Sequence, residues 1–217
     1  MINSQPILAI ETSDKICSVC VYFSSSKYFE AKIELVHSHS EKLFTLIDFV
    51  MKQASLELKD ISPIAISSGP GSFTGLRIGM AAAKGISKAL SIPIVPVPTF
   101  EALALQLSEY LSEGTQFSIA NKVNKDEVYF AQFQIKDRSF IFTHELKILP
   151  STILADFKEE LIFGNAEISS SANKKNVCTP DALYIAKWCE VFGEKFMSLD
   201  IDNLEPNYIR NFLVKRN

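Results

Sequence analysis

Apolar residues recur along the chain first in short alternating runs and then in longer helical stripes. Three runs with the two-residue period of a strand come first, separated by the polar turns 11–15 and 24–27. The first half is expected to contain strands at 7–10, 16–23, 28–36, 61–66 and 92–98, and helices at 38–54, 76–90 and 100–111. This order predicts a three-strand meander that two parallel crossovers extend into one mixed sheet.

The same order of elements returns, in a shorter form, in the second half. Residues 112–115 form a polar turn that we expect to separate the halves, at 1–112 and 113–217. After this turn the pattern predicts strands at 117–120, 127–135, 139–149 and 161–163, and helices at 151–160 and 180–192. We therefore expect an α/β protein built from two β-β-β-α-β-α halves with a cleft between them.

A loop rich in glycine joins the fourth predicted strand to the second predicted helix. It comprises residues 69–77, Gly-Pro-Gly-Ser-Phe-Thr-Gly-Leu-Arg, and is called the glycine loop below. Backbone N–H groups at a helix N-terminus attract an anion or the polar end of a ligand, and glycines let a backbone come close to it. The loop has neither the Walker A nor the G-x-G-x-x-G spacing. The alternative is a tight strand-to-helix turn that Thr74 caps.

The first predicted helix carries apolar side chains on more than one face. Its stripe is formed by Leu43, Ile47, Val50 and Ala54, with Leu46 beside it and Phe44, Phe49 and Met51 outside it. Either both faces are buried within one domain, or one face meets a partner protein. The second helix contains small residues that would let another helix or strand approach closely, among them Gly79, Ala82, Ala83, Gly85 and Ala89.

The amino-acid composition limits the classes of protein to which the chain can belong. Of the 217 residues 47% are hydrophobic and 22% are charged, and the net charge is −3, which favours a packed core over strong direct nucleic-acid binding. Neither a signal peptide nor a membrane span is apparent, so we expect a cytoplasmic protein. Cys17 and Cys20 lie three apart on a predicted strand and should face opposite sides as buried, unreactive thiols.

The histidines and the loop serine offer little for metal or nucleophilic chemistry. His37 and His39 stand two apart at a strand-to-helix junction near Glu41, and His144 is isolated, so no metal site is expected. Ser72 has no histidine that the sequence assigns to it, which disfavours a protease.

Five stretches of the chain match one known family. They are ILAIETS at 7–13, HSEKL at 39–43, SGPGSFTGLRIG at 68–79, PVPTFEAL at 96–103 and EPNYIR at 205–210. With these motifs the sequence resembles the TsaB family (also called YeaZ) of threonylcarbamoyladenosine synthesis on tRNA, and the glycine loop is shared with the paralogue TsaD. The resemblance implies the actin-like ATPase fold, made of two RNase H-like halves.

The resemblance also implies a role as a non-catalytic scaffold rather than an enzyme. Such a protein binds and stabilises the transferase TsaD, the ATPase TsaE joins the pair, and tRNA is met through the complex; a homodimer through the same helices is the alternative. The contact is implied to be a bundle of the first two helices of each partner. The implied interface residues are Leu43, Phe44, Ile47, Val50, Met51, Gly79, Ala82, Ala83 and Ile86.

A residual nucleotide site, with weak ATP or ADP binding and no required cofactor or metal, is a further implication. Its residues would be Glu11, Thr12, Ser13, Gly69, Gly71, Ser72, Thr74, Gly75 and Arg77. Arg77 would either neutralise phosphate or hold the loop through a structural contact.

Two departures from the family pattern bear on that nucleotide site. Glu11 stands where the family often has aspartate, and Lys122-Val123-Asn124 stands where Asp-Ala-Arg often precedes Glu127-Val128-Tyr129. The alternative function is an ATP-dependent phosphotransferase of the same fold, which the incomplete set of catalytic carboxylates disfavours.

Overall fold

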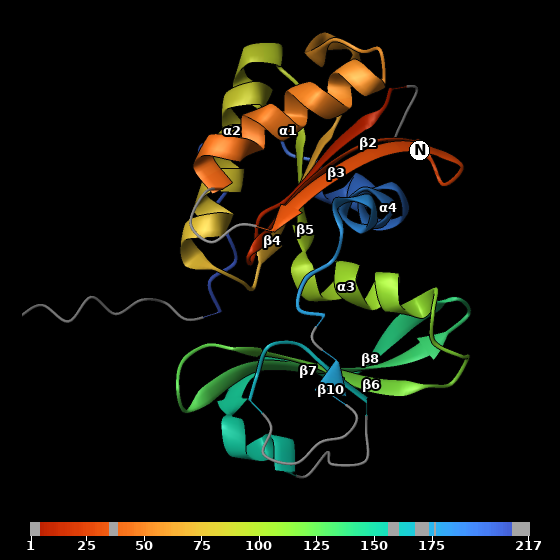
Figure 1. Ribbon diagram of the computed structural model, residues 1–217, viewed down its shortest axis with the longest axis vertical. Coiled ribbons are helices and arrows are strands. Elements are labelled where there is room, and N and C mark those ends of the chain that lie inside the picture. Colours follow the sequence, from red (N-terminus) through yellow and green to blue (C-terminus); the bar gives the residue numbers. More distant parts are fainter. Residues whose placement is uncertain (1–4, 35–38, 156–160, 168–173, 176, 210–217) are drawn as a thin grey trace, which may run out of the picture.

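The computed structural model describes residues 5–34, 39–155, 161–167, 174–175 and 177–209, and it contains two five-stranded sheets (Figure 1). The first sheet comprises β1 (Ile7–Glu11), β2 (Ile16–Ser24), β3 (Lys27–Glu34), β4 (Ile64–Gly69) and β5 (Ile94–Pro98), in the order β3-β2-β1-β4-β5. The second comprises β6 (Gln116–Lys122), β7 (Glu127–Lys136), β8 (Ser139–Pro150), β9 (Leu161–Phe163) and β10 (Lys174–Lys175), in the order β10-β9-β6-β7-β8.

Both sheets are built in the same way. In the first, β1, β2 and β3 form an antiparallel meander, β4 is parallel to β1, and β5 is parallel to β4. In the second, β6, β7 and β8 form the meander, β9 is parallel to β6, and β10 is parallel to β9. The repeated strand order confirms the predicted α/β class, with two RNase H-like halves of the actin-like ATPase fold.

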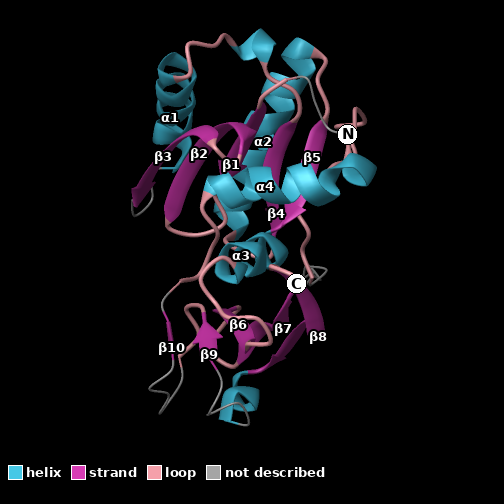
Figure 2. Ribbon diagram, turned by 90° about the vertical axis from the view of Figure 1, so that its right-hand side faces the viewer, coloured by secondary structure: helices cyan, strands magenta, loops and turns pink. Residues whose placement is uncertain are grey.

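Four α-helices among the described residues cover the sheets (Figures 1 and 2). One face of the first sheet packs against α1 (His39–Gln53) and α2 (Phe73–Leu90), and the opposite face packs against α4 (Ala182–Phe192). Between the two sheets lies α3 (Thr99–Ser108), whose Phe100 and Leu103 are buried against Phe117 of the second sheet. The molecule is therefore layered along its length, with α3 joining the halves.

The start and the cap of α2 differ from the sequence prediction. Helix α2 begins at Phe73 rather than at 76, because Ser72 is its N-cap and accepts a hydrogen bond from the Gly75 N–H at 3.3 Å. The predicted cap, Thr74, lies inside the helix. Thr99, the first residue of α3, accepts a hydrogen bond from the Gly69 N–H at 3.1 Å through its hydroxyl and so ties the two loops together.

Both helices predicted in the second half also differ from expectation. A short 3₁₀ helix (Ser151–Ala155) stands where the helix 151–160 was predicted, and residues 156–160 lie outside the described part. Helix α4 packs on the first sheet, and its first N–H groups donate to Ser18 Oγ and Glu30 Oε1 at 3.0 and 2.9 Å. The boundary at residue 112 remains a prediction, while the final helix contacts the N-terminal sheet.

Candidate functional site

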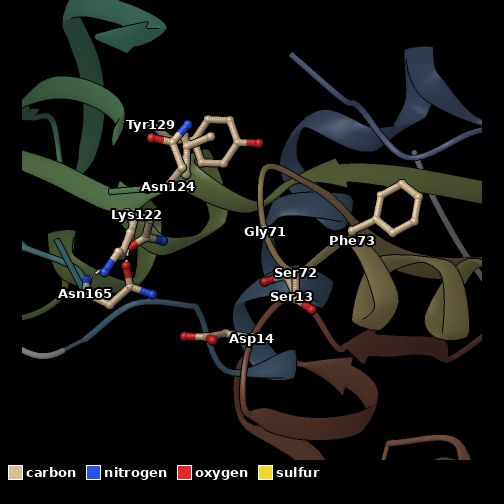
Figure 3. Close-up of a pocket in the computed structure, with 11 residues that line it drawn as sticks. Ser13, Asp14, Gly71, Ser72, Phe73, Lys122, Asn124, Tyr129 and Asn165 are labelled. Carbon is tan, nitrogen blue, oxygen red and sulfur yellow. Dashed lines mark hydrogen bonds between the residues drawn. The ribbon is translucent and has the colours of Figure 1, made fainter. Parts of the chain in front are cut away.

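A cavity of about 430 Å³ opens between the two halves, at the end of α2 where the glycine loop lies (Figure 3). We call it the central cavity. Its first wall comes from the turn after β1 and from the glycine loop, and its second wall comes from the end of β6, from β7 and from the turn after β9. The described lining residues are Ser13, Asp14, Gly71, Ser72, Phe73, Asn121, Lys122, Val123, Asn124, Tyr129 and Asn165.

The glycines of the first wall are required by contact within the chain. A Cβ added to Gly71 would lie 2.4 Å from the Ser13 carbonyl oxygen, and one added to Gly75 would lie 2.0 Å from that of Thr12. A Cβ on Gly79 would lie 2.3 Å from Thr12 Oγ1. The three glycines are spaced four residues apart, so they lie on one side of α2 and of the loop just before it. This side packs on the turn after β1. Close approach to a ligand, the predicted reason, is not needed to explain them.

The N-terminal end of α2 already uses part of its hydrogen-bonding capacity within the chain. The Ser72 N–H donates to the Ser13 carbonyl at 2.6 Å, and the Gly75 N–H donates to Ser72 Oγ. Both are among the N–H groups that would face an anion at a helix start. Ser13 Oγ, in contrast, is buried at the cavity wall and has no partner among the described residues. Ser13 as a whole is 1% exposed, so this hydroxyl lies within the wall and is not presented to a ligand in the cavity.

Glu11 lies behind the cavity rather than in its lining. It is 0% exposed, its Oε1 accepts a hydrogen bond from the Ser13 N–H, and its Oε2 has no partner among the described residues. Burial raises the pKa of this carboxyl to about 7, and the nearby polar groups of Ser13 and Ser67 lower it only in part. The Glu11 carboxyl is thus turned back onto its own turn and does not line the cavity.

Arg77 also lies outside the central cavity. Its guanidinium carbon is 3.8 Å from the centre of the Phe73 ring, and its Nε donates to the Tyr208 hydroxyl at 3.1 Å. This contact corresponds to the second of its two expected roles, a structural contact that holds the loop. Of the nine predicted nucleotide residues, Ser13, Gly71 and Ser72 reach the cavity lining.

Amide side chains organise the second wall, which the sequence prediction missed. Asn121 donates to the Cys178 carbonyl at 2.8 Å and accepts from the Asn165 N–H at 3.1 Å, while Asn165 Oδ1 accepts from the Lys122 N–H at 2.7 Å. Gly164 allows this turn, because its φ is +122° and an added Cβ would lie 2.1 Å from the Ala120 carbonyl oxygen. The glycine-asparagine pair at 164–165 was the available signal.

The charges of the cavity do not fit a nucleoside triphosphate. Lys122 is the one cation among the described lining residues, and its ammonium already lies 3.1 Å from Glu167. Asp14 adds a negative charge and points toward the second wall (Figure 3). Several phosphate charges would therefore meet little compensation.

The predicted partner interface requires a correction. Eight of its nine residues are buried in the core of the first half, namely Leu43, Ile47, Val50, Met51, Gly79, Ala82, Ala83 and Ile86. These side chains face the first sheet because α1 and α2 lie across it, so they are not available to another protein. Phe44 is the predicted residue that is exposed, at 57%.

A different set of residues forms the outer surface of α1 and α2. Phe49 is 51% exposed on α1, and α2 presents Ala81, Gly85 and Ala89 at intervals of four residues. Nothing lies within 4 Å of a Cβ built on Gly85. We call Phe44, Phe49, Ala81, Gly85 and Ala89 the outer helix face.

The described cysteines and histidines provide few groups for thiol or metal chemistry. Cys17 and Cys20 are fully buried in core clusters on opposite faces of the first sheet, as predicted, and burial raises the pKa of Cys17 to about 11 and that of Cys20 further. No group of three or more histidine, cysteine, aspartate or glutamate residues gathers there in a metal-binding arrangement. His37 and the side chain of His39 lie outside the described part. None of the described helices is long and apolar enough to cross a membrane.

Comparison of the sequence with known proteins identifies relatives that share one pathway, the biosynthesis of threonylcarbamoyladenosine on tRNA. The family model TsaD, described as tRNA N6-adenosine threonylcarbamoyltransferase, matches residues 34–181. The chain is 31% identical to the tRNA threonylcarbamoyladenosine biosynthesis protein TsaB of Escherichia coli, over 94% of each chain. It is 32% identical to the TsaB protein of Buchnera aphidicola subsp. Baizongia pistaciae, over 82% of this chain and 86% of that relative.

Two solved structures from Pseudomonas aeruginosa share the fold. YeaZ has a TM-score of 0.77 and 21% identity, with 94% of this chain and 99% of that chain covered. A protein described as similar to peptidase YEAZ has a TM-score of 0.78 and 22% identity, with 95% and 100% covered. At this identity the likeness establishes the fold, in agreement with the repeated strand order.

Proposed function

The chain belongs to the TsaB family, and from that membership we propose that it is a cytoplasmic, non-catalytic scaffold in the biosynthesis of threonylcarbamoyladenosine on tRNA. It binds and stabilises a TsaD transferase, helps to recruit the ATPase TsaE, and meets tRNA through that complex. The family names support the pathway, and the net charge of −3 agrees with an indirect contact to tRNA.

The main structural support for this proposal is the exposed outer helix face. Two phenylalanines more than half exposed lie on α1, and small residues on α2 leave room for a second helix to come close. The core side of both helices is already filled by the first sheet. A partner that adds its own two helices would bury the apolar surface that the chain alone leaves in water.

The central cavity supports the non-catalytic part of the proposal. The Ser72 hydroxyl serves as a helix cap, and Glu11 is buried behind the wall. Ser72 does line the cavity, but no histidine among the described lining residues could activate its hydroxyl as a nucleophile, and Glu11 is not placed there as a metal ligand. A phosphotransferase would also need cations for its nucleotide, which the lining lacks apart from the paired Lys122. We therefore propose that the chain requires no cofactor.

Phe44→Asp is expected to weaken binding to the cognate TsaD by about thirty-fold, the effect of losing an aromatic anchor and placing a charge in its contact. Titration of each variant against TsaD, followed by calorimetry, measures this change. Phe44 is 57% exposed, so the fold itself should tolerate the substitution. Ile47→Asp cannot serve this purpose, because Ile47 is 3% exposed and its replacement would place an unpaired charge in the core.

Val191→Asp is the matched control, since Val191 is 62% exposed on α4, on the opposite face of the sheet. Size-exclusion chromatography with light scattering of the unmodified chain mixed with TsaD should give a heterodimer. A chain that stays a homodimer or a monomer in this mixture would overturn the scaffold proposal. Equal binding by the Phe44 and Val191 variants would instead overturn the assigned surface.

A further inference from the structure

The C-terminal segment 198–209, called the strap here, runs along α2 from the edge of the first sheet to the glycine loop (Figure 1). At its start, Ser198 and Ile94 exchange two backbone hydrogen bonds of 2.9 Å at the edge of β5. Ile201 and Leu204 then pack against the core of the first half. Near its end, the Asn207 N–H donates to the Ser68 carbonyl at 2.7 Å.

The strap ends in a stack of three side chains over the first turns of α2. The Tyr208 ring lies 5.2 Å from the Phe73 ring, between centroids, and its hydroxyl accepts from Arg77 Nε. The Arg77 guanidinium covers the Phe73 ring and lies 5.9 Å from the Tyr208 ring. Cation–π and aromatic contacts of this kind each contribute modestly at an exposed site. The end of the strap is therefore held by contacts that can be released without unfolding the core.

The surroundings of Gly69 show how closely the strap approaches the glycine loop. Its φ is +110°, and an added Cβ would lie 3.0 Å from the Asn207 carbonyl oxygen and 3.2 Å from Leu76. The first glycine of the loop thus leaves room for the strap. Residues 205–209, the described part of the matching C-terminal motif, and the glycine loop are far apart in sequence but form one structural unit.

Phe73 connects this unit to the central cavity. The residue is part of the cavity lining, and its ring is stacked on Tyr208. The adjacent Ser72 holds the same turn to Ser13 on the opposite side. The first turn of α2 is consequently fixed from two directions, by the turn after β1 and by the strap.

We propose that the strap is a releasable brace that sets the position of the glycine loop and of the first turn of α2. When the strap is docked, Phe73 and Arg77 are held away from the second half. When it is released, the wall of the central cavity and the start of the outer helix face become mobile together. The brace acts within the isolated chain and does not depend on the proposed partner.

Tyr208→Ala is expected to increase hydrogen exchange of the backbone amides of residues 69–76 by about ten-fold, the size expected when one hydrogen bond and one exposed cation–π interaction are removed together. Mass spectrometry of the purified chain measures this rate peptide by peptide. Exchange in the second sheet, over residues 116–136, should stay unchanged and serves as the internal reference.

Two truncations separate the strap from the residues that follow it. Deletion of 204–217 removes the end of the strap and should reproduce or exceed the Tyr208→Ala effect. Deletion of 210–217 leaves the described strap intact and is the matched control, with exchange at 69–76 expected to equal that of the full chain. Unchanged exchange at 69–76 after deletion of 204–217 would overturn the proposal, as would an equal increase in the second sheet.

Discussion

Gly75→Ala is expected to destabilise the protein by about 3 kcal/mol or more, because the new methyl group has no room. Its Cβ would lie 2.0 Å from the Thr12 carbonyl oxygen, which belongs to the backbone and cannot rotate aside. Relief requires α2 to move off the turn after β1, which would disturb a contact in which both Thr12 and Gly75 are buried. Urea unfolding followed by circular dichroism measures the decrease in the free energy of unfolding.

Gly85→Ala provides a control in the same helix. Gly85 is exposed, and nothing lies within 4 Å of its added Cβ, so alanine should stabilise the helix by up to about 1 kcal/mol through its higher helix propensity. The two substitutions are chemically identical and should have opposite signs. A Gly75 variant as stable as the original chain would show that α2 does not pack on Thr12 as described.

The glycine loop shows what the sequence could and could not predict. Its position between a strand and a helix was correct, and so was its special backbone. The four-residue spacing of Gly71, Gly75 and Gly79 already indicated one face of a helix. The neighbouring sequence, however, does not indicate which turn packs against that face. That turn, around Thr12, lies about sixty residues earlier and is brought close by the parallel pairing of β1 and β4.

The interface prediction failed for a related reason. The apolar pattern correctly placed two helices and gave α1 more than one apolar face. Periodicity alone does not say which face meets the sheet, and Ile47 and Phe44 are equally apolar in the sequence. Burial separates them, at 3% and 57% exposed. The same holds for α4, whose buried Trp188 is explained by the first sheet, although its sequence position suggested the second half.

A second large effect on stability is expected from Glu11, because the fold keeps its carboxyl almost entirely out of water. Its pKa is raised from 4.5 to about 7, with burial as the largest cause and the nearby Asp14 charge acting in the same direction. The ionised carboxyl also raises the pKa of the neighbouring Cys17. A carboxyl that prefers the protonated form in the folded state binds more protons there than in the unfolded chain.

The sign of the resulting pH dependence follows from this difference in bound protons. Below the unfolded pKa near 4.5 both states are protonated, and the contribution to stability is fully present. As pH rises, the unfolded chain releases the proton first, so stability falls until the folded pKa near 7 is passed. Above that pH both states are ionised and the loss is complete.

Glu11→Gln should remove this part of the pH dependence, since glutamine keeps an acceptor for the Ser13 N–H and carries no titratable proton. The original chain is expected to lose about 3 kcal/mol relative to the variant between about pH 4 and about pH 8. Urea unfolding of both proteins at several pH values measures this difference, and other carboxyls with shifted pKa values, such as Glu101, cancel in the comparison. A difference that stays constant with pH would mean that Glu11 has the same pKa in the folded and unfolded chains, so that its carboxyl is ionised in the fold at neutral pH. The buried carboxylate would then need a cation or donor that the described residues do not supply, and the first cavity wall would have to be arranged differently around it.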